Sequence, residues 1–225
     1  MKSIKLRNYV AGLTAAILVA AISLTHAKTA KPLLHGKHWV AITGKPLGAS
    51  AGARIFYQGG NAVDATCAML AATSTMWDVL SWGGETQALI YNPHTGEVIG
   101  VNALGVAPTG ATPEFFHEQG MQYPPEFGPL AAVTPGTPGG LMVMLAEYGT
   151  LSLEDVLAPA IEMAEGYPIE ASAVSAINRS KQLLEQWPAS RAVFLPNEGE
   201  GPEAPGVGEV FRQPDLKATL EKLVA

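Results

Sequence analysis

The chain has 225 residues, 48% of them hydrophobic and 15% charged, so it can bury a sizeable core and does not have the composition of a disordered protein. Its formal net charge of -6 argues against a general nucleic-acid binder, because phosphate binding needs a basic surface and Lys and Arg cluster only at the extreme N-terminus. The 24 glycines and 17 prolines indicate many turns and argue against a plain helical bundle.

The beginning of the chain has the pattern of a Sec-type signal peptide over residues 1–27. A positive region is followed by an apolar, alanine-rich stretch and a small-x-small sequence: Lys2, Lys5 and Arg7, then Val10–Leu24, then Thr25-His26-Ala27. We predict cleavage after Ala27, which leaves residues 28–225 as an exported chain, periplasmic or secreted, with no stable membrane anchor. The alternative is an uncleaved anchor, for which about fifteen apolar residues are few.

The part of the chain that follows is predicted to contain a strand and then a helix. Residues 39–42 (WVAI) indicate a short buried strand. Pro46 opens a helix that runs to Tyr57 and ends at Gly59-Gly60, since glycine adopts the left-handed capping conformation without steric cost. Leu47, Ala51 and Ile55 are spaced by four and are expected on one face of this helix.

A second helix is predicted from Ala62 to about Thr75. Asn61 can cap it, and Asp64 lies where an acid suits the helix dipole. Because this helix is small and apolar nearly all round, we expect it to be buried on several sides. The strand, turn and returning strand of a hairpin come next: Ala88–Asn92, Pro93–Gly96 and Glu97–Asn102.

The second half of the chain is predicted to be mainly helical. Caps and closing glycines indicate a helix from Thr112-Pro113, one over Gly139–Tyr148 before Gly149, and one over Leu153–Glu165 after Ser152. Residues 197–209 are rich in Gly, Pro and Glu and predict an exposed loop. Pro214-Asp215 starts an amphipathic helix, and the sequence stops inside its apolar pattern. We therefore expect a longer natural protein, with ordinary fraying at a natural C-terminus as the alternative.

The residues by themselves indicate no reaction. The chain has no Gly-x-Ser-x-Gly, Walker or Gly-x-Gly-x-x-Gly sequence, and its five histidines do not pair at helical metal-ligand spacing. His35 and His38 are close together, but they lie in a polar segment where solvated side chains are expected. Cys67, the only cysteine, lies in an apolar run that favours a buried thiol over a nucleophile. No metal, nucleotide or organic cofactor is implied.

Several segments resemble the γ-glutamyltranspeptidase family and occur in the family's order. Residues Gln58–Ala65 (QGGNAVDA) resemble the family signature QGGNAVDAA. The others extend the resemblance over nearly all of the predicted mature chain: Ala107-Pro108 with Ala111-Thr112-Pro113, Thr134–Leu141 (TPGTPGGL), Tyr148–Leu151 (YGTL) with Val156–Ile161 (VLAPAI), and Arg212–Leu216 (RQPDL) with Thr219-Leu220.

The resemblance implies an α/β (α+β) fold, the αββα sandwich of the N-terminal-nucleophile hydrolases. This chain would be the N-terminal part of the large subunit and would form only part of that sandwich. A family proenzyme cuts itself before a threonine, whose hydroxyl attacks a γ-glutamyl or related acyl amide with its own α-amine as base. That threonine is expected in a missing C-terminal segment or small subunit, which is the implied partner. The resemblance thus implies no catalytic residue in this chain, no activity for the chain alone, a small-molecule amide as substrate, and no cofactor.

The sequence departs from the family pattern at two places. Leu104 stands where the family has an arginine, in a D-G-R-E segment, that holds the α-carboxylate of the γ-glutamyl group. Losing such a contact costs on the order of 1.5–3 kcal/mol, about ten- to hundredfold in affinity, unless another basic residue compensates. Only Gly83 and Gly84 match the family's SGIGGGGF segment. These departures favour an acylase of the same superfamily with a non-glutamyl substrate as one alternative; a non-enzymatic exported binding scaffold or a decayed gene is the other.

Overall fold

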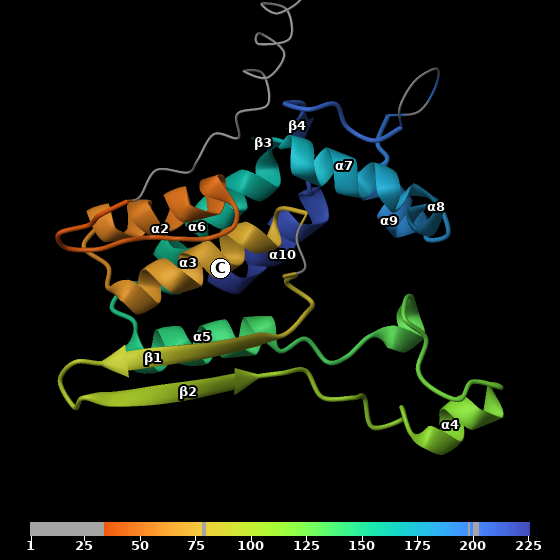
Figure 1. The fold of residues 1–225 in the computed structure, drawn as a ribbon, viewed down its shortest axis with the longest axis horizontal. Coiled ribbons are helices and arrows are strands. Elements are labelled where there is room, and N and C mark those ends of the chain that lie inside the picture. The colour runs from red at the N-terminus through yellow and green to blue at the C-terminus, as the bar shows by residue number, and fades with distance from the viewer. Residues whose placement is uncertain (1–33, 78–79, 198, 200–202) are drawn as a thin grey trace, which may run out of the picture. The chain divides into compact units, whose positions relative to one another are not determined.

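The computed structural model describes residues 34–77, 80–197, 199 and 203–225, so the predicted signal peptide lies outside the described residues. The chain divides into two compact units, Met1–Lys37 and His38–Ala225. Of the first unit, residues 34–37 are described and are exposed. The second unit carries all the helices and strands of the described part (Figure 1). No helix in that part is long and apolar enough to cross a membrane.

A group of helices around α3 (Ala62–Ser74) forms the larger hydrophobic core. Helix α3 packs against α2 (Pro46–Tyr57), α5 (Thr137–Tyr148) and α6 (Leu153–Glu165), and α6 also packs against α10 (Pro214–Val224) (Figure 1). The alanines of α3 let these helices approach closely, and four of them are fully buried: Ala65, Ala68, Ala71 and Ala72. Burial of α3 on several sides is therefore confirmed.

Helix α3 begins at Asn61, the cap that the sequence predicts, and the structure adds a bond from Asp64 that completes a capping box. The Asn61 side chain accepts from the N–H groups of Val63 and Asp64 at 2.7 and 3.0 Å, and the Asp64 carboxylate accepts from Asn61 N–H at 2.8 Å. Gly59, with φ of 89°, makes the turn out of α2. A Cβ on Gly60 would lie 2.6 Å from Ile55, so the turn can approach the core only because this residue is glycine.

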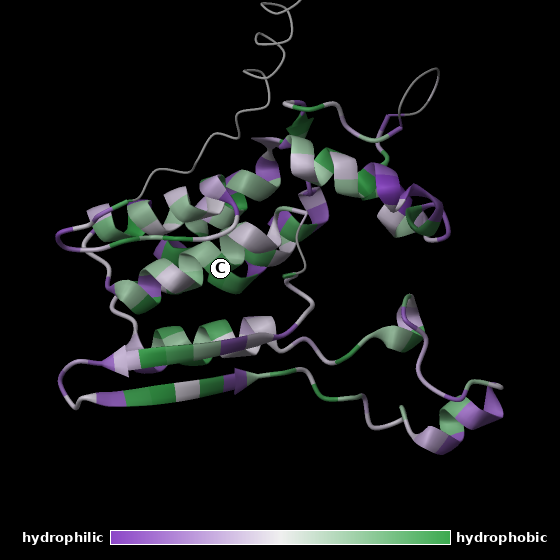
Figure 2. Ribbon diagram, in the orientation of Figure 1, coloured by the Kyte–Doolittle hydropathy of each residue, from purple (hydrophilic) through white to green (hydrophobic). Residues whose placement is uncertain are grey.

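The predicted hairpin is confirmed as an antiparallel pair, β1 (Thr86–Asn92) and β2 (Glu97–Ala103). Its inner side chains pack on the α3 core, next to α5: Ala88, Ile90 and Val101. Alternate side chains point away, and Leu89 is 80% exposed. Figure 2 shows hydrophobic residues along both strands, and the exposed ones include Leu89, Tyr91 and Val98.

Residues 167–211 form a smaller region, which we call the C-terminal lobe. It contains the strand pair β3 (Tyr167–Pro168) and β4 (Val210–Phe211) and the short helices α7 (Ala171–Arg179), α8 (Lys181–Leu184) and α9 (Pro188–Phe194). Its described residues surround a second hydrophobic cluster that includes Ile169, Ile177 and Phe211. Between β2 and α5, the chain forms α4 (Pro113–Glu118) and the 3₁₀ helix η1 (Pro129–Ala131).

Two predictions about individual elements are wrong. Residues 39–42 form no strand, since no described segment pairs with them; Ile42 is 74% exposed, and the segment covers α2 by stacking Trp39 on Phe56. The loop 197–209 is not exposed throughout, because Ala204 is buried in the second cluster and its neighbour Pro205 is buried as well. The other predicted helices are present, with α5 beginning earlier than predicted, at Thr137.

Candidate functional site

Three segments meet at the end of the hairpin where β1 starts and β2 stops. They are the loop Leu80–Gly84, the residues that follow Ala103, and the start of α5. The N–H groups of Gly136 and Thr137 both donate to the Gly84 carbonyl, at 2.8 and 3.0 Å. The hydroxyls of Thr86 and Thr137 lie 3.0 Å apart, so strand β1 and helix α5 are also joined by side chains.

Glycine is required at the contact between β2 and α5. A Cβ on Gly136 would lie 2.0 Å from the Ala103 carbonyl oxygen, and a Cβ on Gly105 would lie 2.0 Å from that of Thr134. Backbone therefore packs directly on backbone here, and two glycines of the segment 134–141 (TPGTPGGL), Gly136 and Gly140, are needed for the approach to Ala103. The contact fixes the backbone on both sides of Leu104.

Leu104 follows the last residue of β2 and is the one substrate-site position that the sequence analysis identifies. Its N–H donates to the Asn102 side chain at 3.2 Å, and the residue is 40% exposed. At this position the chain presents an aliphatic side chain, which cannot pair with a carboxylate.

The chain's buried thiol, and a threonine that bonds to a buried aspartate, are not activated nucleophiles. Burial, with the charge of Asp64 adding to it, raises the pKa of Cys67 to about 12, so the thiolate needed for attack is suppressed. The Thr150 hydroxyl donates to Asp64 at 2.6 Å, which by itself could suggest a nucleophile and its base. The aspartate, however, is fully buried and also accepts from the backbone N–H groups of Asn61, Thr150 and Leu151.

Those hydrogen bonds decide the chemistry of Asp64. Burial alone would raise the pKa of its carboxyl, but the bond from the Thr150 side chain and the three backbone bonds outweigh burial and lower the pKa below the ordinary value. A carboxylate with a lowered pKa and occupied oxygens is a weak base. Asp64 therefore connects the start of α3 to the loop before α6, and the role of the QGGNAVDA segment that contains it is structural.

A groove of about 510 Å³ lies between the start of α3 and β1, and the sequence analysis did not predict it. Every residue from Ala88 to His94 lines it, and Asn61, Thr66 and Tyr148 form the opposite wall. Because successive strand residues face opposite sides, a groove lined by all of them runs along the edge of β1. That edge has no partner strand in the described part of the chain. The described residues hold no group of His, Cys, Asp and Glu that could bind a metal.

Comparison with known proteins gives concordant matches. The family described as gamma-glutamyltranspeptidase matches residues 48–225. The chain is 31% identical to a glutathione hydrolase proenzyme of Bacillus subtilis (strain 168), over 93% of this chain and 37% of that protein. It is 32% identical to the acylase ACY 1 proenzyme of Pseudomonas sp. (strain SE83), over 84% of this chain and 35% of that protein. The chain thus spans little more than a third of the length of these curated relatives.

The fold agrees with a solved structure as well. The crystal structure of Helicobacter pylori gamma-glutamyltranspeptidase matches with a TM-score of 0.78 and 31% identity, over 85% of this chain and 55% of that chain. The predicted fold class is confirmed, since these helices and antiparallel strands form part of the N-terminal-nucleophile hydrolase fold.

Proposed function

Because the chain belongs to the gamma-glutamyltranspeptidase family, we propose that it is the scaffold-forming, N-terminal part of an amide-cleaving proenzyme. A threonine in the portion of the relatives that this chain does not cover would supply the nucleophilic hydroxyl and, after self-cleavage, the α-amine that acts as base. The substrate class is a small γ-glutamyl or related acyl amide. The scaffold's role is to hold the substrate next to that threonine.

The hairpin is the observation that carries this proposal. Its inner face packs on the α3 core, whereas its outer face carries Leu89 at 80% exposure and Tyr91 and Val98 at 64%. The edge of β1 is also unpaired in the described part, with an apolar groove beside it. A two-stranded sheet with an open apolar face is marginal in water. Further strands from the uncovered portion of the family fold would complete such a sheet.

The test uses γ-glutamyl-p-nitroanilide. The purified 225-residue chain is expected to release no p-nitroaniline and to show no self-cleavage, whereas a product extended by any open reading frame beyond codon 225 is expected to do both. Changing the threonine at the cleavage point of the extended product to alanine is the matched control and should abolish both activities. Turnover by the 225-residue chain alone would contradict the proposal, and a stop codon at position 226 would favour the non-enzymatic scaffold.

Leu104 supports an acylase as the second candidate. We propose that it occupies the position of the family arginine and lies against an acyl group without an α-carboxylate. The 32% identity to an acylase proenzyme is in keeping with this substrate class. In the extended product, Leu104→Arg should raise γ-glutamyl hydrolysis about ten- to hundredfold, the value of one charge-assisted contact. Leu104→Met, which keeps the side chain apolar, should leave it unchanged. An arginine variant that behaves like the methionine variant would show that Leu104 is not at the acyl site.

Export is proposed from residues 1–27. Edman sequencing of the protein from expressing cells should give Lys28 as the first residue, and Ala27→Phe should block that cleavage. A mature protein that retains residues 1–27 in the otherwise unaltered chain would overturn this proposal and favour the anchor.

A further inference from the structure

The described residues of the second unit contain two hydrophobic clusters with almost no residues in common. The first surrounds α3, and the second lies in the C-terminal lobe. Met163, near the end of α6, packs on both. None of α7, α8 or α9 is among the elements with extensive contacts to α2, α3, α5, α6 or α10. Few contacts therefore connect the helices of the lobe to the α3 core, and weakly connected regions are the ones that open locally.

The chain leaves α3 through the second cluster. Met76 is buried there, and the Trp77 ring meets Phe194 of α9 edge-on, with centroids 4.8 Å apart. We call residues 75–77 the α3 exit. After it, the chain leads to the loop Leu80–Gly84, whose Gly84 carbonyl holds the start of α5 at the candidate site. The position of the α3 exit thus depends on the lobe.

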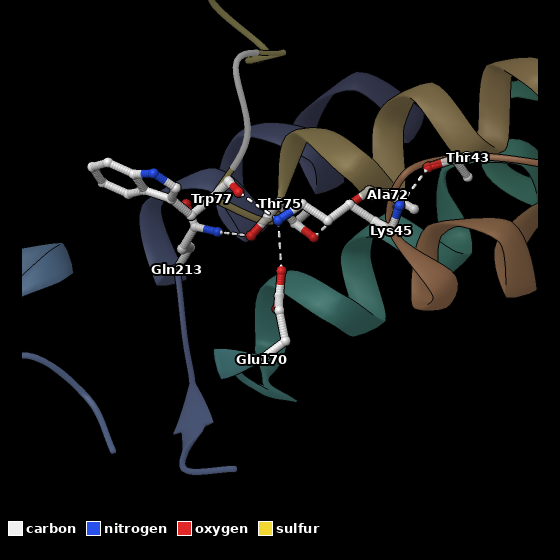
Figure 3. Close-up of polar contacts among 7 residues, drawn as sticks. All are labelled: Thr43, Lys45, Ala72, Thr75, Trp77, Glu170 and Gln213. Carbon is white, nitrogen blue, oxygen red and sulfur yellow. Dashed lines mark hydrogen bonds and ion pairs between the residues drawn. The ribbon is translucent and has the colours of Figure 1, made fainter. Parts of the chain in front are cut away.

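Polar side chains from three other segments converge on the α3 exit (Figure 3). The Lys45 ammonium, just before α2, donates to the Trp77 carbonyl at 2.7 Å and to Glu170, just before α7, at 2.6 Å. The Gln213 side chain, just before α10, donates to the Thr75 carbonyl. Lys45 and Glu170 are 125 residues apart in sequence, so their contact ties the lobe to the beginning of the core.

The Lys45–Glu170 pair is well shielded. The side chains are 12% and 29% exposed, and the second carboxylate oxygen of Glu170 is buried with no hydrogen-bond partner among the described residues. Removing the lysine would leave a shielded carboxylate without its cation, which is costly, whereas replacing both partners by apolar residues is often neutral. A different ion pair, Arg54–Glu162, joins α2 to α6 at 2.7 Å with side chains 39% and 63% exposed. It joins two helices of the α3 core at their surface, without a residue of the lobe, and so provides a control.

We propose that Lys45 and Glu170 form a polar lock that holds the C-terminal lobe closed on the α3 exit, while Gln213, just before α10, holds the exit from the side of the α3 core. Opening of the lobe and displacement of the α3 exit then occur together, and the lobe controls where the chain enters the loop Leu80–Gly84. The lock is a conformational device, and it does not depend on which amide, if any, the protein cleaves.

Hydrogen exchange of the 225-residue chain, measured residue by residue, tests the lock. In Lys45→Met, amides of α7–α9 and of Met76 should exchange about tenfold faster or more, as expected for a shielded pair that loses one partner. Amides in the middle of α3 and α6 should keep their rates. In the control variant Arg54→Met, exchange in α7–α9 should change less than about twofold, because exposed pairs contribute little.

The double variant Lys45→Met/Glu170→Leu tests whether the two side chains act as a pair. It also replaces the single variant in the test if Lys45→Met folds poorly. It should restore exchange in α7–α9 to within about threefold of the unaltered chain, because no charge is then left without a partner. Unchanged exchange in α7–α9 of Lys45→Met would overturn the lock. Equal acceleration in α3 and the lobe would also overturn it, as would a double variant that exchanges as fast as the single one.

Discussion

The α3 core and the C-terminal lobe reach burial in different ways. The core brings helices together over alanines and fastens the start of α3 with one buried carboxylate that accepts four hydrogen bonds. The lobe has short helices and relies on rings: Tyr167 and Phe194 both pack on Phe211, with centroids 6.0 and 5.8 Å apart. The core therefore depends on one polar joint and many small contacts, and the lobe on a few large side chains. The substitution that lowers stability most is therefore expected to differ between the two regions.

The largest effect is expected at the polar joint of the core. Asp64→Ala removes a buried, charged acceptor and leaves part-buried N–H and O–H donors without partners, which is costly. We expect the free energy of unfolding to fall by about 4–5 kcal/mol, measured by urea denaturation. Asp155→Ala is the matched control, since Asp155 occupies the same position in α6 but is exposed; it should cost about 1 kcal/mol. Equal losses in the two variants would show that Asp64 is an ordinary cap.

A somewhat smaller and more local loss is expected in the lobe. Phe211→Ala removes the ring that Tyr167 and Phe194 share and should cost about 3 kcal/mol. Because the clusters are separate, faster hydrogen exchange should be confined to the lobe and the α3 exit. The control Phe115→Ala changes a ring in α4, outside both clusters, and should leave the lobe amides as they were. Faster exchange throughout α3 in Phe211→Ala would mean that the two regions unfold as one.

The pH dependence of stability separates the two regions further. The lowered pKa of Asp64 means that its stabilising contribution is fully present above the ordinary aspartate pKa of about 4 and is lost as pH falls through the lower folded value. Between pH 5 and pH 2, the α3 core should lose stability more steeply in the unaltered chain than in Asp64→Asn, which has no carboxylate to protonate at this position. Parallel curves for the two proteins, followed by hydrogen exchange in α3, would contradict this assignment.

What could be predicted from the sequence differs between local and distant interactions. The caps at Asn61 and Ser152 join residues three apart, so their patterns are visible in the sequence, and both helices start as predicted. The strand at residues 39–42 failed because a strand needs a partner, and a short apolar run does not reveal whether one exists. The Lys45–Glu170 pair and the contact of Gly136 with Ala103 join distant segments, so no local pattern could predict them. Leu104 was found only through a family resemblance.

The smallest effect on stability is expected at the outer face of the hairpin, and it sharpens the comparison between packed and open surfaces. Leu89→Thr keeps a good strand former and replaces an exposed side chain, so the free energy of unfolding of the 225-residue chain should change by less than about 0.5 kcal/mol. Ile90→Thr, on the inner face, should cost about 1–2 kcal/mol. If the outer face is covered by the remainder of a proenzyme, the order reverses in the extended product, where Leu89→Thr should impair folding and self-cleavage. An extended product that tolerates Leu89→Thr as well as the short chain does would show that no further strand or sheet covers this face.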